Sequence, residues 1–289
     1  MFERIGRGWG IAKASWSVVK THPKLLVLPI FSGIAFLLLI GSILLSVFAG
    51  ANSPRLHQWL DHLKNVKFDD PVVYGLVFVF YFVCSFIVIF FNAALVFCAL
   101  EAFAGRTPSL RGGLATAVGR LPQILAWALV AATVGLVLNA LQNLLKDKLG
   151  FLGSLLGGLL ELAWAVVTYF VVPVLVVDGV GPIEAVKRSS AILKRTWGES
   201  VGGEGGLGII SFLLLLPAFL LIALAVAAGG GAVVAVIVPV VVLYIVVLSV
   251  VFTALGTIFR TGAYIYATTG KAPSSIDPAL LQGAFRKKD

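Results

Sequence analysis

Residues 57–70, HQWLDHLKNVKFDD, hold the richest group of side chains that could do chemistry in this sequence. His57 and Asp61 are four residues apart, with His62 beside them, so the three would lie close together on a helix. Imidazole and carboxylate groups bind metal ions, which makes these residues candidate ligands. The spacing does not match a standard motif such as His-Glu-x-x-His. We therefore prefer a short helix that rests on lipid through Leu56, Trp59, Leu60 and Leu63, and we expect no metal or cofactor.

Glu161 is the one carboxylate inside a long apolar run, and an ionisable group at membrane depth is a candidate functional residue. The depth of Glu161 in the bilayer decides its role. If the part of the run that crosses the membrane lies nearer Asp178, Glu161 is close to the headgroups. If that part lies nearer Gly150, Glu161 approaches the bilayer centre and needs a partner or a proton. Both positions are compatible with the sequence. The other polar candidates within apolar runs, which we expect to form hydrogen bonds between helices, are Asn92, Asn139 and Gln142.

Catalytic motifs are not found in this sequence. It contains neither Gly-x-Ser-x-Gly nor a phosphate-binding Walker sequence, and no nucleophile and base stand at a useful spacing. The glycine-rich stretch 198–208 contains glutamates that would repel phosphate, so it is interpreted as a connector. We expect no catalytic residues and a protein that is not an enzyme.

The composition predicts a membrane protein. Hydrophobic residues make up 60% of the 289 residues, and the mean hydropathy is +1.04. A soluble domain is apolar over about half of its residues. Runs long enough to cross a bilayer, which takes about 20 residues, occupy 25–49, 72–100, 122–145, 152–177, 207–228 and 232–258.

The positive charges indicate how these runs are oriented. Of the 22 Lys and Arg residues, 17 fall in the segments on one side of the six runs. By the positive-inside rule that side is cytoplasmic, and it includes both termini. We therefore predict a multi-pass protein of the cytoplasmic (inner) membrane. The net charge of +9 reflects this topology, so we expect no nucleic acid partner.

Basic segments with an apolar stripe precede the first, third and fifth runs. In residues 181–200, Gly181-Pro182 is typical of a helix start, and Ile183, Val186 and Leu193 share one face. A shorter segment has Thr107 as its expected N-cap. The alternative, ordinary basic loops, would explain the charges but not the stripes. The residues that we expect to bind lipid or a partner on the cytoplasmic face are Arg4, Arg7, Trp9, Lys13, Trp16, Arg106, Arg111, Arg120, Lys187, Arg188, Lys194, Arg195 and Trp197.

The predicted fold is all-α: a polytopic membrane helix bundle with six transmembrane helices and three amphipathic helices on the cytoplasmic face. It forms a single membrane domain over residues 1–289, arranged as three units, each an amphipathic helix followed by a hairpin of two spans. The units are 1–100, 101–177 and 178–258, and 259–289 is a cytoplasmic C-terminal tail.

Three stretches carry a family resemblance: the opening MFERIGRGWGIAKASWSVVKTHPKLLVLPIFSG, the internal GPIEAVKRSSAILKRTWG and the closing RTGAYIYATTGKAPSSIDPALLQGAFRKKD. With them the chain resembles a family of uncharacterised bacterial six-span integral membrane proteins. The Pro-x-Glu-Ala helix is also distantly similar to the membrane domain of some glycerophosphodiester phosphodiesterases. The resemblance implies the topology, and it implies no activity.

The sequence favours a non-enzymatic membrane protein that organises the membrane, or binds lipid or a partner, through its basic amphipathic helices. The partners expected are membrane lipids of anionic character, another membrane protein or further copies of the chain. The alternative is a transporter or channel for a small solute or ion that uses Glu161 and proline-kinked spans.

Overall fold

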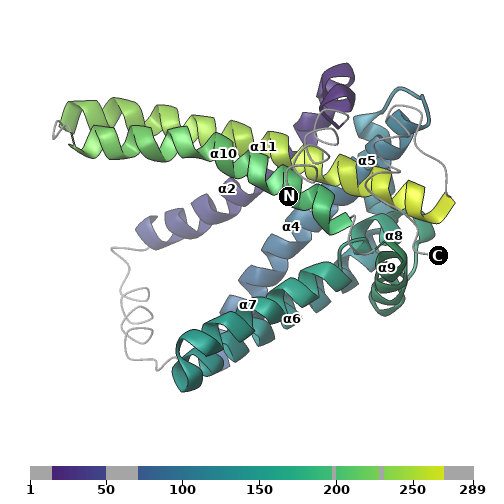
Figure 1. The fold of residues 1–289 in the computed structure, drawn as a ribbon, viewed down its shortest axis with the longest axis horizontal. Helices are drawn as coiled ribbons and strands as arrows, with labels where there is room; N and C mark the ends of the chain where they lie inside the picture. The colour runs from purple at the N-terminus through teal and green to yellow at the C-terminus, as the bar shows by residue number, and fades with distance from the viewer. Residues whose placement is uncertain (1–14, 50–70, 197–199, 228–230, 270–289) are drawn as a thin grey trace.

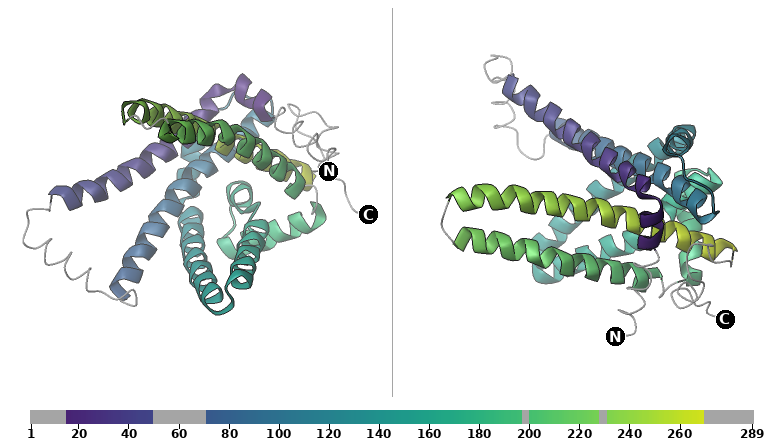
Figure 2. Two further views of the ribbon diagram at one scale, coloured as in Figure 1. Left: turned by 60° about the vertical axis from the view of Figure 1, so that its left-hand side comes forward. Right: turned by 90° about the horizontal axis from the view of Figure 1, so that it is seen from above.

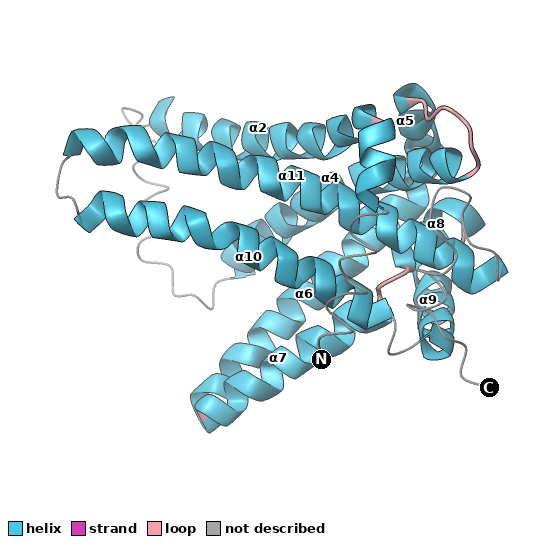
Figure 3. Ribbon diagram, turned by 45° about the horizontal axis from the view of Figure 1, so that its top comes forward, coloured by secondary structure: helices cyan, strands magenta, loops and turns pink. Residues whose placement is uncertain are grey.

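The structure is a computed structural model that describes residues 15–49, 71–196, 200–227 and 231–269. These residues form helices joined by short connections, and none of them forms a strand (Figure 3). The predicted all-α class is therefore confirmed.

Six helical segments are long and apolar enough to cross a membrane, as the sequence predicts. The first consists of η1 (Pro23–Leu26) and α2 (Val27–Ala49), and the fourth of α7 (Phe151–Val167) and α8 (Val171–Asp178). The others are α4 (Pro71–Phe103), α6 (Leu121–Leu149), α10 (Ser200–Ala227) and α11 (Gly231–Thr269). Two shorter helices, α5 (Leu110–Gly119) and α9 (Pro182–Thr196), follow the second and fourth spans.

The last helix is longer than the apolar run suggested. It continues to Thr269, so the first part of the expected tail 259–289 is helical. Phe259, Ala263 and Tyr264 are buried there, because this stretch of α11 packs against α4 and α8. Packing of these side chains extends the helix beyond the length that a bilayer requires.

The helices gather at one end of the molecule and diverge toward the other (Figures 1 and 2). The packed end consists of α5, α8 and α9 together with residues 93–103 of α4 and 254–264 of α11. At the splayed end, the α6–α7 hairpin, the α10–α11 hairpin and the far end of α2 point in different directions. Large apolar side chains are exposed there, with Phe48 at 75% and Phe151 at 82%, as expected for surfaces that face lipid.

Small residues allow the helices of the packed end to approach closely. Ala94 and Ala99 of α4 are fully buried. A Cβ added at Gly113 of α5 would lie 2.7 Å from both the Ala94 carbonyl oxygen and the Cys98 Sγ. Glycine is therefore required where α5 crosses α4.

The start of α5 corrects one prediction. Ser109, and not Thr107, is the N-cap, because its Oγ accepts a hydrogen bond from the Gly112 N–H at 3.3 Å. Starting the helix at Leu110 places Leu110 and Leu114 on one side, where both pack against the core.

The hairpin between the third and fourth spans contains a close helix approach at Gly153 and Gly157. The turn is made by Gly150, whose φ of 56° favours glycine. A Cβ at Gly153 would collide with the backbone of Leu145, and a Cβ at Gly157 would lie 2.6 Å from the Gln142 Cγ. The two glycines therefore let α6 and α7 pack along each other.

Candidate functional site

The fourth span is interrupted where α7 gives way to α8. Pro173 has no N–H to donate to the carbonyl of Tyr169, and its ring disfavours helical geometry one turn earlier. Around the break the backbone instead makes hydrogen bonds to the residue three positions earlier, as in a 3₁₀ turn. The Tyr169 N–H donates to the Val166 oxygen at 3.3 Å, and the Val171 N–H donates to the Thr168 oxygen at 3.0 Å. The span is thus a broken helix.

Ser189 of α9 bonds the backbone on both sides of this break. Its Oγ donates to the Val167 carbonyl oxygen at 2.7 Å and accepts from the Phe170 N–H at 3.0 Å. Ser189 is fully buried, and an unsatisfied buried polar group costs about 1–3 kcal/mol. One hydroxyl group therefore stabilises the break and fixes α9 against the fourth span.

A cavity of about 550 Å³ lies beside the break. Its walls come from α4, α7, α8, α9, α10 and α11 and from the connection between α7 and α8. Most of its surface is apolar. The lining residues are Asn92, Val96, Leu162, Ala165, Val166, Thr168, Tyr169, Val172, Pro173, Leu193, Gly205, Thr257 and Arg260.

One cation, Arg260, is among the described residues that line the cavity. The Arg260 Cζ lies 5.3 Å from the centroid of the Tyr169 ring, which is a cation–π contact. One turn earlier on α11, the Thr257 Oγ1 donates to the Asn92 Oδ1 at 3.4 Å, and this bond joins α11 to α4. None of the described lining residues is an Asp or Glu. The cavity therefore has a mainly apolar wall, with the Arg260 guanidinium packed against the Tyr169 ring.

Arg188 belongs to an ionic cluster that joins α8, α9 and α11. Its guanidinium donates to the Asp178 Oδ2 at 2.8 Å and to the Glu184 Oε1 at 3.0 Å. The Tyr264 hydroxyl donates to the Asp178 Oδ1 at 3.1 Å. Hydrogen bonds to Asp178 and Glu184 raise the pKa of Arg188, so it stays protonated. Two carboxylates offset its charge, and its role is to hold α9 in place.

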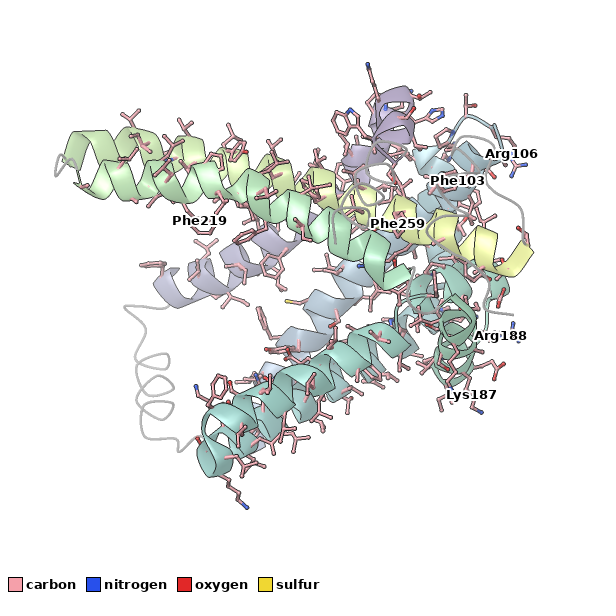
Figure 4. The ribbon with its side chains drawn as sticks, viewed as in Figure 1. Phe103, Arg106, Lys187, Arg188, Phe219 and Phe259 are labelled. Atoms are coloured by element: carbon pink, nitrogen blue, oxygen red, sulfur yellow. The ribbon has the colours of Figure 1, made fainter. Side chains whose placement is uncertain are left out.

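Two other predicted surface cations also contact protein groups. Arg106 forms a two-pronged ion pair with Glu101, at 2.6 and 2.9 Å. The Arg120 Nε donates to the Val176 carbonyl oxygen at 3.3 Å, where it caps the end of α8. Lys187, Lys194 and Arg111 are exposed, and Trp16 is 47% exposed. Figure 4 shows Lys187 and Arg188 on α9 and Arg106 at the same end of the molecule.

The apolar side of α9 packs on protein, where the sequence suggested a lipid surface. Ala185, Ser189 and Leu193 form its buried face, and α9 contacts α8, α7, α11 and α6. Ile183, which we expected on the lipid-facing stripe, is 72% exposed. A helix that must bury its apolar stripe can do so against neighbouring helices as well as against lipid. Docking on protein leaves Lys187 on the outer side of α9.

The structure does not bring the four predicted polar span residues together. Asn92 lines the cavity and forms the expected bond between helices. Asn139 accepts a hydrogen bond within its own helix, from Asn143 at 3.3 Å. Gln142 packs where α7 crosses α6, and Glu161 is exposed on α7 outside the cavity lining.

Several predicted residues lie outside the described part of the chain. They include the candidate metal ligands His57, Asp61 and His62 and the surface residues Arg4, Arg7, Trp9, Lys13 and Trp197. Arg195 lies in the last turn of α9. Among the residues that the structure describes, no group of three His, Cys, Asp or Glu could hold a metal ion.

Sequence reasoning did not single out Arg260, the cation in the lining of the cavity. Arg260 was counted only as one cation of the C-terminal tail. The available signal was its context, because FRTGAYIY places a single Arg between aromatic and small residues of the kind that pack in helix interfaces.

A family of unknown function (DUF6159) matches residues 72–274. The chain belongs to this family. The matched region begins in α4 and ends beyond α11, so it contains every residue that lines the cavity. No curated protein and no solved structure matches the chain. The resemblance to the membrane domain of glycerophosphodiester phosphodiesterases stays a prediction.

Proposed function

We propose that this protein is a non-enzymatic, multi-pass protein of the bacterial cytoplasmic membrane that gathers anionic lipids around its packed end, which faces the cytoplasm. The distribution of Lys and Arg along the chain supports this orientation. The same surface could dock a membrane protein or a second copy of the chain, but headgroups meet it first because α9 begins where the fourth span ends.

The observation that carries the proposal is the docking of α9. Its buried face, the Ser189 bonds and the Arg188 cluster fix the helix on the bundle. Lys187 and Lys194 are thereby held exposed beside the end of a span. Each Lys or Arg near an anionic membrane surface contributes about 1 kcal/mol of attraction. A fixed pair of lysines enriches anionic lipid without any catalytic step.

The test is the lipid composition that surrounds the protein. Wild type and the double variant Lys187→Gln/Lys194→Gln are extracted with their neighbouring lipids in polymer-bounded discs, and the lipids are quantified by mass spectrometry. We expect the variant to retain a smaller anionic fraction, and high salt to shrink the difference. The control is Lys146→Gln/Lys148→Gln, which removes two cations from the splayed end. An anionic fraction equal in all three proteins would overturn the proposal.

A second candidate function is transport of a small solute or ion. The observation that favours it is the broken fourth span, because transporters build substrate sites at interrupted helices. Flux into proteoliposomes tests it, with Glu161→Gln as the comparison variant. Flux at the level of empty vesicles across a broad panel of solutes would contradict transport.

A further inference from the structure

We propose that the cavity beside the broken span receives one hydrocarbon chain of a phospholipid, which enters sideways from the bilayer between α7 and α10. The site recognises the apolar chain and not the headgroup. The proposal requires that the spans lie in a membrane, and it does not depend on the anionic lipids of the function proposed above.

The polar side chains of the wall already have partners within the protein. Asn92 and Thr257 bond each other across two helices. The Thr168 hydroxyl donates to a backbone carbonyl oxygen of α7 at 2.8 Å, and the Arg260 guanidinium packs on the Tyr169 ring. An apolar ligand fits such a wall, because it requires no hydrogen bond from these groups.

Water is a poor occupant of this cavity. An ordered water needs about two to four polar partners, and Ser189 of α9 already bonds the Val167 carbonyl and the Phe170 N–H at the break. An empty cavity of about 550 Å³ would leave the side chains of the wall without dispersion contacts. The volume is within the size range of small-ligand sites, roughly 300–1,000 Å³. A hydrocarbon chain restores the missing contacts.

The cavity is closed on one side and open on the other. Its floor consists of Val96 of α4 and Leu193 of α9, which are 1% and 2% exposed. Its mouth consists of Leu162 and Ala165 of α7 and Gly205 of α10, which are all exposed. A Cβ added at Gly205 would meet no atom within 4 Å, so there is free space at this edge. The opening therefore lies between α7 and α10.

The mouth faces the bilayer, because both helices that border it belong to spans. Away from the cavity, α7 packs on α6 and α9, and α10 packs on α11. The two hairpins diverge toward the splayed end (Figures 1 and 2). At a rise of 1.5 Å per residue, Leu162 and Ala165 lie about 17 and 21 Å along α7 from Phe151, within a hydrocarbon core about 30 Å thick. The solvent at this part of the mouth is therefore hydrocarbon.

The direction of the mouth matches the chain of a phospholipid. Gly205 is at the start of the fifth span, at the level of the membrane surface. From there the mouth extends to Leu162, deeper in the hydrocarbon. A phospholipid chain begins at its glycerol near the surface and runs inward, so it can bend into the cavity while its headgroup stays outside. Dispersion packing favours this position, because the chain is in apolar surroundings both in the bilayer and in the cavity.

The experiment maps the residues that a lipid chain reaches. The full chain is reconstituted in phosphatidylcholine that carries a photoactivatable diazirine within one acyl chain, and the cross-linked residues are located by mass spectrometry of peptides. We expect cross-links on Val96 and Leu193, which are buried and accessible only through the cavity. Phe219, which is 58% exposed on α10, should be labelled by the surrounding bilayer. Wild-type protein labelled on Phe219 and not on the floor would overturn the proposal.

A substitution at the mouth tests the route of entry. Ala165→Phe places a ring at the mouth, and Ala163→Phe, on the same helix but outside the lining, is its matched control. Both alanines are exposed, so neither substitution disturbs the buried core. We expect only Ala165→Phe to lose the cross-links on the floor, and both variants to keep those on Phe219. Equal labelling of the floor in the two variants would contradict the proposal, and the wild-type result decides it if Ala165→Phe fails to fold.

Two further arms separate the sources of the chain and the two proposals. A free fatty acid with the same diazirine replaces the labelled phospholipid, and labelling of the floor by the fatty acid alone would overturn the assignment to a phospholipid. Lys187→Gln/Lys194→Gln should leave labelling of the floor by phosphatidylcholine unchanged, because this lipid has no net charge. An unchanged anionic fraction in the lipid-disc experiment would refute the function proposed above and leave this site standing, whereas an unlabelled floor would refute this site alone.

Discussion

The fourth and fifth spans each contain a proline well inside the apolar segment, and only one of them breaks. Pro173 lies just beyond the interruption between α7 and α8, whereas α10 runs continuously through Pro217. Both prolines remove a backbone donor. The difference lies in the neighbouring helix. Ser189 bonds a donor and an acceptor at the break, while in α10 the Tyr244 hydroxyl donates to a single carbonyl, that of Leu214, at 2.7 Å.

This difference shows that a proline permits a break and a partner side chain maintains it. In a lipid environment, freed backbone groups need a protein partner, because no water is present to bond them. The fourth span has such a partner in α9, which packs against α8 and α7. The fifth span exposes most of its surface, including Phe219 at 58%, and stays helical (Figure 4).

The largest effect is expected at Ser189. Ser189→Ala removes the hydroxyl from the buried Val167 carbonyl and Phe170 N–H, so it should lower the free energy of unfolding by about 2–4 kcal/mol. The measurement is denaturant unfolding in detergent micelles. Ser190→Ala is the control, because its hydroxyl bonds only the Lys187 carbonyl within α9. If the two variants unfold alike, Ser189 does not maintain the break.

The next largest change in unfolding free energy is expected when a glycine of the fourth span, rather than one of the fifth span, is replaced by alanine. Gly153→Ala in the fourth span collides with the Leu145 backbone and should cost about 1–3 kcal/mol. Gly208→Ala in the fifth span meets no atom within 4 Å, so it should be neutral or stabilise by up to about 1 kcal/mol. Thermal unfolding of the two variants measures both values. A Gly208→Ala cost as large as that of Gly153→Ala would show that the fifth span is packed more tightly than described.

The smallest effect concerns the prolines themselves. Pro173→Ala and Pro217→Ala should each change the unfolding free energy by less than about 1 kcal/mol, because membrane helices tolerate proline when neighbours bond the freed groups. The sharper readout is a double-mutant cycle. If Pro173 and Ser189 act on one break, Ser189→Ala should cost less in the Pro173→Ala background. If the free-energy effects of the two substitutions are strictly additive, Pro173 does not contribute to the break that Ser189 stabilises.

The spans could be predicted from the sequence because a bilayer dictates their length and composition. The Gly153 and Gly157 contact was also predictable, since spacing alone places both on one helix face. The break was not, because Pro173 and Pro217 look alike in the sequence and the deciding residue, Ser189, lies on another helix. The packing of α9 on protein could not be predicted either, because an apolar stripe does not indicate whether lipid or protein will cover it.

The cavity needed the tertiary structure for a similar reason. Asn92 was a candidate polar residue, but its partner Thr257 lies 165 residues away in the chain. Arg260 looked like a residue beyond the last span, because apolar composition alone ended that span at residue 258. Only the burial of Phe259, Ala263 and Tyr264 shows that the helix continues and brings the guanidinium to Tyr169.

The bond between Asn92 and Thr257 has a consequence for biosynthesis. At a translation rate of roughly 5–20 residues per second, α4 enters the membrane about 10 to 30 seconds before the residues of α11 that complete its surroundings. During that interval the alanine-rich face of α4 and the Asn92 amide have no final partner from α11. The assembly of the packed end therefore awaits the last span, and we expect nascent chains stalled ahead of α11 to be the form that membrane proteases remove.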